Sequence, residues 1–179
     1  SSLKWMEFRG GKLEKLASAS PVQYSNHIVL LGVHRMGANI LSALKSIEET
    51  YVLVDFDPSI VEKYKKLNEP ILYGDISEDE IKEFAALNHA RAVISTIPDL
   101  NDSTYLLEYM KKENPKAIAI VTAENEWEAK SLYKLGASYV ILPHFIGGLQ
   151  IAQAIKKDHD FEHLDKLKKN DLALMRVGE

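Results

Sequence analysis

Short runs of apolar residues recur along the chain, separated by longer segments in which apolar residues return every three or four positions. A run that is apolar throughout is typical of a strand buried on both faces of a parallel sheet. Six strands of this kind are predicted, at residues 28–31, 51–54, 70–73, 92–96, 116–122 and 138–142.

The segments between these strands have the spacing of amphipathic helices. After the first strand a helix begins near Arg35, and further helices are predicted at residues 59–67, 78–87, 103–112 and 126–135. Ser77 and Glu80 have the spacing of a capping box, and Gly136 follows the last of these helices as a C-cap. Regular alternation of strand and helix predicts an α/β fold, a doubly wound parallel six-stranded sheet with flanking helices.

The two ends of the chain depart from this pattern. Residues 1–25 are interpreted as a lead-in helix and linker, with a segment lying on a membrane surface as the alternative. Residues 26–157 form the sheet domain, which ends with an apolar helix at 149–156 introduced by Gly147 and Gly148. Residues 158–179 form a polar helical tail with a short charged helix at 161–169. Elements beyond residue 142 are expected to pack on another subunit or on the outside of the domain.

The stretch between the first two strands resembles the first half of a dinucleotide-binding βαβ unit. Gly32 allows a sharp turn at the strand end, and Gly37 allows the following helix to pack closely against that strand. The helix directs backbone N–H groups and its positive dipole end at the turn, where a phosphate can bind. Asp55 ends the next strand, where a carboxylate can accept hydrogen bonds from ribose hydroxyls and disfavours NADP.

His34 breaks the glycine pattern, because it occupies the place of the middle glycine that normally lets a pyrophosphate approach the backbone. Either the ligand is smaller or tilted, such as AMP or ADP, or the site is degenerate and empty. Arg35 could compensate by pairing with a phosphate, and the alternative is a solvated side chain in the first helical turn.

Further candidates lie where other strands end, because ligands of open α/β sheets bind beyond the carboxyl ends of the strands. Gly74 and Asp75 follow the third strand, and Asp75 is expected at the adenine end of a nucleotide. Its alternative role is to accept local N–H groups in a turn. Thr96 ends the fourth strand and either lines the pocket or is a strand-end hydroxyl.

Composition and missing motifs narrow the function further. A net charge of −4 and a pI near 5.9 argue against a general nucleic-acid-binding protein. The absence of cysteine excludes disulfides, a thiolate nucleophile and a thiolate metal site. No Walker-type loop, G-x-S-x-G turn or acid–base pair is evident. His159 and His163 stand four residues apart in a charged tail, and no metal is assigned to them.

An ordered set of motifs resembles the TrkA-N domain, also called the RCK or KTN domain. The resemblance covers residues 26–155 and rests on Gly32-x-x-Arg35-x-Gly37, Val54-Asp55-x-Asp57-Pro58, Tyr73-Gly74-Asp75, Val93-Ile94-Ser95-Thr96, and Leu135-Gly136-Ala137 with Gly147-Gly148. It implies a Rossmann-like regulatory domain rather than an enzyme, with Asp55 on the ribose and Asp75 beside the adenosine. The residues it assigns to the ligand are Gly32, Val33, His34, Arg35, Met36, Gly37, Asp55, Phe56, Asp57, Gly74, Asp75, Ile76, Thr96 and Ile97.

The family resemblance also implies partners. Such domains form homodimers, here through the helix at 149–156, and regulate a membrane-embedded cation transporter. The expected arrangement is a domain at the cytoplasmic face of the membrane, fused behind the transporter part of a potassium or sodium/proton antiporter of the Kef type. The expected ligand is an adenine nucleotide: His34 favours AMP, ADP or ATP over NAD(H), AMP is expected first among them, and no nucleic acid is expected.

Three other functions fit parts of the sequence. A small NAD-dependent oxidoreductase requires a catalytic pair near Thr96, and none is evident. A scaffold that only dimerises predicts that no nucleotide binds. A soluble subunit that regulates Trk-type potassium uptake predicts the same nucleotide site, but noncovalent binding to the transporter.

Overall fold

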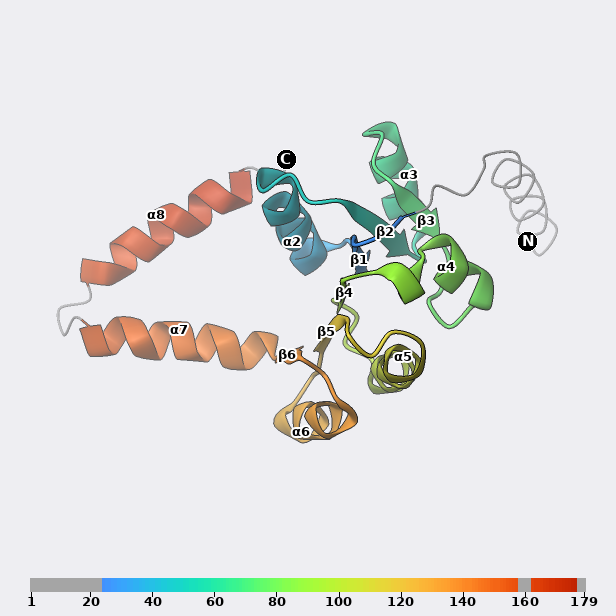
Figure 1. Ribbon diagram of the computed structural model, residues 1–179. Coiled ribbons are helices and arrows are strands. Elements are labelled where there is room, and N and C mark those ends of the chain that lie inside the picture. The colour runs from blue at the N-terminus through green and yellow to red at the C-terminus, as the bar shows by residue number, and fades with distance from the viewer. Residues whose placement is uncertain (1–23, 158–161, 177–179) are drawn as a thin grey trace, which may run out of the picture.

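The computed structural model describes residues 24–157 and 162–176, which form a sheet with helices around it (Figure 1). The lead-in helix predicted within residues 1–25 lies outside the described residues. The strands are β1 (Ile28–Leu31), β2 (Tyr51–Asp55), β3 (Ile71–Tyr73), β4 (Ala92–Ser95), β5 (Ile118–Thr122) and β6 (Tyr139–Ile141).

All five strand pairs are parallel, and the order across the sheet is β3-β2-β1-β4-β5-β6. The predicted six-stranded parallel sheet is therefore confirmed. After β3 the chain crosses to the other side of β1 to form β4. The carboxyl ends of β1 and β4 consequently mark the switch point, where open α/β sheets bind their ligands.

Helices cover both faces of the sheet because successive side chains of β1 point to opposite faces. Ile28 and Leu30 belong to the apolar cluster on the side of α2 and α3. Val29 and Leu31 belong to the cluster on the side of α4, α5 and α6. The helices are α2 (Arg35–Ser46), α3 (Pro58–Lys66), α4 (Asp79–Phe84), α5 (Leu100–Glu113), α6 (Glu126–Leu135), α7 (Pro143–Lys157) and α8 (Glu162–Arg176).

Helix α6 has the bounds that the sequence predicts, and Gly136 is its left-handed C-cap at φ 107°. Helix α5 begins earlier than the predicted residue 103. Asp99 is its N-cap, and its side chain accepts hydrogen bonds from the backbone N–H groups of Asn101 and Asp102. An Asp in the loop after a strand, here Asp99, is thus a start signal for the next helix.

The capping box predicted for Ser77 and Glu80 is wrong. Helix α4 begins at Asp79, and its N-cap residue Glu78 makes no side-chain cap hydrogen bond. The loop before α4 is instead stabilised by Asp75, which accepts the backbone N–H of Ser77 at 2.7 Å. A 3₁₀ turn, η1 (Leu87–His89), replaces the predicted last turn of this helix.

The last two helices are both longer than predicted. Helix α7 begins at Pro143, which suits the first helical turn because its ring already fixes φ, and the Ile146 N–H bonds to the Leu142 carbonyl. Gly147 and Gly148 therefore lie inside α7 rather than before it. Helix α8 replaces the short helix predicted at 161–169. Within the described ranges 24–157 and 162–176, no helix has the length and apolar character needed to cross a membrane.

Candidate functional site

The turn between β1 and α2 requires glycine at position 32. Gly32 has φ +79°, which L side chains rarely adopt. A Cβ there would lie 2.6 Å from the hydroxyl oxygen of Thr96. Thr96 Oγ1 donates to the Gly32 carbonyl at 2.9 Å, so this hydroxyl stabilises the turn. Thr96 thus joins β4 to the glycine turn, and it is not among the residues that line the pocket described below.

Gly37 permits the close packing of α2 that the sequence predicts. A Cβ at this position would lie 2.0 Å from the Gly32 carbonyl oxygen. The first turn of α2 is consequently in contact with the end of β1. No acidic residue occupies that turn, so no side-chain charge competes there with an anion near the helix N-terminus.

Asp55 connects the end of β2 to the glycine turn. Its side chain is buried, and Oδ2 accepts the Val33 N–H at 2.8 Å while Oδ1 accepts the Asp57 N–H at 2.9 Å. This structural role was not predicted from the sequence, although a carboxylate beside a glycine turn is a signal for it. Each carboxylate oxygen can accept a second hydrogen bond, so the predicted contact with ribose remains compatible with this geometry.

His34 does not need to be glycine for the backbone to fold, since its φ is −72°. Its imidazole is 56% exposed, and Nε2 lies 3.6 Å from Oδ2 of Asp57. Asp57 is also the N-cap of α3, and hydrogen bonds from the Ser59 hydroxyl and N–H hold the pKa of Asp57 below its usual value. Arg35 and Met36 begin α2, with Arg35 exposed and Met36 half-buried.

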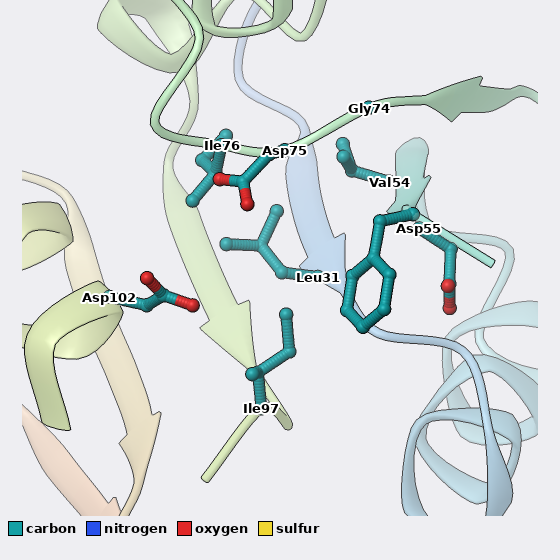
Figure 2. A pocket seen from close by; sticks show the side chains of 9 residues that line it. Leu31, Val54, Asp55, Gly74, Asp75, Ile76, Ile97 and Asp102 are labelled. Carbon is teal, nitrogen blue, oxygen red and sulfur yellow. The ribbon is translucent and has the colours of Figure 1, made fainter. Parts of the chain in front are cut away.

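A small pocket, with a volume of about 20 Å³, opens beside these residues at the carboxyl edge of the sheet (Figure 2). Six predicted residues line it: Asp55, Phe56, Gly74, Asp75, Ile76 and Ile97. Leu31, Val54 and Asp102 complete the lining. Eight predicted residues are not part of the lining: Gly32, Val33, His34, Arg35, Met36, Gly37, Asp57 and Thr96.

The pocket combines an apolar wall with an acidic one. Leu31 and Ile97 lie between the carboxylates of Asp75 and Asp102 on one side and Asp55 on the other (Figure 2). Burial, followed by the charges of Asp99 and Asp75, raises the pKa of Asp102. Sequence reasoning missed Asp102, although its place in the helix after β4 could have indicated it.

Asp75 has the local turn role that the sequence offers as an alternative, and it also lies at the pocket. It lines the pocket, and its Oδ1 accepts the Ser77 N–H in a local turn. Among the described residues, no group of three or more His, Asp and Glu side chains is placed to hold a metal ion. The chemistry available at this edge is therefore a helix N-terminus, a small apolar cavity and carboxylate acceptors.

Residues 28–143, well over half of the chain, match the TrkA-N domain family. Potassium channel protein 1 of Methanocaldococcus jannaschii is 28% identical over 137 residues, 75% of this chain and 41% of that protein. The putative cation/proton antiporter YbaL of Escherichia coli is 24% identical over 122 residues, 68% of this chain and 22% of that protein. The chain thus spans less than half the length of either relative.

Solved structures share the fold. The TrkA-N domain of the Escherichia coli inner membrane protein YbaL aligns with a TM-score of 0.70 and 21% identity, over 74% of this chain and 98% of that chain. The Shewanella denitrificans Kef CTD in AMP-bound form aligns with a TM-score of 0.63 and 19% identity, over 86% of this chain and 88% of that chain. Together with the match over residues 28–143, these findings show that the chain belongs to the TrkA-N domain family.

Proposed function

We propose that this chain is a regulatory domain that binds an adenine nucleotide and passes the effect of binding to a monovalent cation/proton antiporter. The observation that carries the proposal is the meeting of a glycine turn, a helix N-terminus and a partly apolar pocket at the switch point of the sheet. The Kef domain of the same fold is known in an AMP-bound form, which supports AMP as the first ligand to test.

In this proposal, the two parts of a nucleotide bind at different places, one at the pocket and the other at the glycine turn. The adenosine would lie over the mouth of the pocket, with its base against Phe56 and Ile97 and its ribose near Asp55. The phosphate would lie at the turn from Gly32 to Gly37, close to the N-terminus of α2 and to the exposed Arg35. The acidic lining keeps a phosphate out of the pocket itself, because like charges repel.

A thermal-shift experiment tests this placement with AMP, ADP, ATP, NAD and NADH. At about 100 times its Kd, AMP should add roughly 2.7 kcal/mol to the stability of the wild-type domain. Phe56→Ala and Arg35→Gln should reduce that shift, because they remove the base contact and the phosphate contact. Trp127→Ala is the matched control, since Trp127 is an exposed aromatic residue on α6 outside the pocket.

The outcomes separate the candidate functions. A shift with AMP that Phe56→Ala weakens supports the sensor. A shift with NAD or NADH alone would mean that the ligand is a dinucleotide rather than AMP. Turnover assays would then have to test whether the domain is an oxidoreductase. The absence of a shift with all five nucleotides would overturn the proposal in favour of a scaffold.

We also propose that the domain works as a homodimer through α7. Five large apolar side chains on this helix are at least 41% exposed, namely those of Phe145, Ile146, Leu149, Ile151 and Ile155. Only Ala154 of this helix is buried. Exposed apolar surface of this kind favours association. Leu149→Glu should give a folded monomer by analytical ultracentrifugation, whereas Leu67→Glu, at an exposed leucine beside α3, should leave the dimer intact.

The transporter itself is the last part of the proposal. The chain spans only 41% and 22% of the two relatives, a potassium channel and a putative antiporter. We place the domain on the cytoplasmic face of the membrane, within the polypeptide of a potassium or sodium/proton antiporter. Ion flux through the full protein in vesicles, with and without AMP, distinguishes this arrangement from a separate subunit of the Trk type that must be added.

A further inference from the structure

Lys82 on α4 is buried, with a residue exposure of 4%. Lysine is almost never buried to this extent without a partner, because removing an ammonium group from water is costly. The glycine turn and the pocket lining do not include Lys82. The burial of Lys82 is therefore not explained by direct contact with the pocket.

The ammonium group lies among partners from two helices and one loop. It donates to the Ser77 carbonyl at 3.2 Å and to the Tyr105 hydroxyl, and it pairs with Asp79 at 2.6 Å. It also lies 4.7 Å from the ring centroid of Tyr105 and 5.1 Å from that of Tyr109, both on α5. Lys82 thereby joins α4 and α5 to the loop between β3 and α4.

The charge of Lys82 persists in this environment. Burial acts to lower the pKa of Lys82, but hydrogen bonds with Asp79 and Tyr105 outweigh it, so the pKa is raised. The side chain is consequently an ammonium donor at neutral pH. An ammonium group that lies over two tyrosine rings is held in a more defined position than that of an exposed lysine, whose long side chain samples many rotamers.

Ser77 connects this lysine to the pocket. Its carbonyl accepts hydrogen bonds from Lys82 and, at 3.4 Å, from the Tyr105 hydroxyl. Its N–H donates to Oδ1 of Asp75 at 2.7 Å. The carboxylate of Asp75 lines the pocket and faces its interior (Figure 2). Two hydrogen bonds, joined by the backbone of Ser77, therefore connect Lys82 to a pocket acceptor.

We propose that Lys82 is a positioning residue for nucleotide binding, which holds Ser77 so that Asp75 presents its carboxylate to the adenine end of the ligand. This inference rests on the proposed function, because it assigns a role within the same pocket. Lys82 itself does not touch the nucleotide. It acts through the loop, and its removal should loosen the orientation of Asp75 without emptying the pocket.

Isothermal titration of the full chain with AMP tests the role of Lys82. Lys82→Met keeps the length of the side chain and removes its charge, and it should weaken AMP binding about three- to tenfold, the effect of losing one ordinary hydrogen bond. Tyr105→Phe, at a partly exposed position, should weaken it less. Lys63→Met is the matched control, because Lys63 also lies over a tyrosine ring, at 5.6 Å from the centroid of Tyr64.

A double-mutant cycle with Asp75→Asn separates positioning from a general effect on stability. If Lys82 acts through Asp75, Lys82→Met should have little further effect on the AMP Kd once Asp75 is replaced. Equal fold-losses in both backgrounds, or unchanged AMP binding in Lys82→Met, would overturn the inference. If Lys82→Met does not fold, the same cycle with Tyr105→Phe decides. A wild-type chain that binds no nucleotide would instead refute the proposed function.

Discussion

Asp55 and Asp102 are two carboxylates at the same edge of the sheet, and their surroundings differ. Asp55 is buried, and each of its oxygens accepts a backbone N–H. Asp102 lies in the first turn of α5, where burial and the charges of Asp99 and Asp75 raise its pKa. Both oxygens of Asp55 thus have backbone donors, whereas the surroundings of Asp102 disfavour its negative charge.

The difference extends to the two halves of the site. Around Gly32, the turn is stabilised by Asp55, Thr96 and the close packing of Gly37, so these residues serve the fold first. Around Asp102, the pocket brings together acidic groups that repel one another. Ionisable groups whose surroundings disfavour their charged form are candidates for ligand binding. The comparison predicts loss of stability on the turn side and loss of binding on the pocket side.

The largest expected effect is that of Gly37→Ala. Its Cβ would meet a backbone oxygen at 2.0 Å, and neither the helix nor the strand can move away without disturbing the core. We expect a loss of at least about 3 kcal/mol in the free energy of unfolding, measured by urea denaturation. Gly147→Ala is the control, because a Cβ there meets no atom within 4 Å, and it should be neutral or stabilising. Equal stabilities of the two variants would contradict the close packing.

Asp55→Asn should be the next most disruptive change. The amide of asparagine can accept only one of the two backbone N–H groups, and its own N–H₂ faces the other. One buried donor is left unpaired, so we expect a loss of about 1–3 kcal/mol in the free energy of unfolding. Asp165→Asn, at an exposed position on α8, should have almost no effect on this quantity. An unchanged Asp55→Asn denaturation midpoint would show that the carboxylate does not hold the turn.

Asp102→Asn should change stability in the opposite direction. Because the folded pKa of Asp102 is raised above its usual value of 3.8, stability is lost as the pH rises through the interval between these values. At neutral pH the substitution should therefore raise the Tm by about 1–3 °C, and the gain should vanish as the pH approaches 3.8. AMP binding should weaken at the same time, as measured by calorimetry.

Glu108→Gln on the exposed face of α5 is the control for this experiment. It removes a carboxylate from the same helix and should change neither the Tm nor AMP binding. A lower Tm for Asp102→Asn at neutral pH would mean that the charge of Asp102 stabilises the fold. The contrast with Asp55 would then be wrong.

The sequence predicts the turn side better than the pocket side, and the reason is physical. The apolar runs that become β1 and β2, and the spacing of Gly32 and Gly37, are local signals of a shape that the backbone must adopt. The raised pKa of Asp102 depends first on burial, then on the charge of Asp99 and last on that of Asp75, and both burial and the approach of Asp75 exist only after the sheet has formed. Pairs of this kind leave no periodic trace in the sequence.

The glycine pair of α7 and the hydroxyl of Thr96 show where local rules are overridden or incomplete. The glycine pair at 147–148 was expected to precede a helix, because glycine weakens a helix interior by about 1 kcal/mol per residue. Helix α7 nevertheless starts at Pro143, which favours the first turn. The sequence leaves Thr96 either as a pocket residue or as a strand-end hydroxyl, and its hydroxyl donates to the carbonyl of Gly32, 64 positions away in the chain. Long-range hydrogen bonds of this type cannot be read from spacing.

His34→Gly should change stability least and specificity most. The imidazole is mostly exposed and φ is ordinary, so the loss should stay below about 1 kcal/mol, from the added freedom of the unfolded chain. Restoring the middle glycine removes the ring that lies near Asp57 and opens the turn to a pyrophosphate. The affinity for NAD should therefore rise relative to that for AMP in calorimetric titrations. His34→Ala removes the ring but keeps a Cβ. An intermediate ratio of NAD affinity to AMP affinity in this variant would assign part of the effect to the ring and part to the Cβ. If both variants keep the wild-type ratio, His34 does not select the ligand, and the size of the pocket alone must do so.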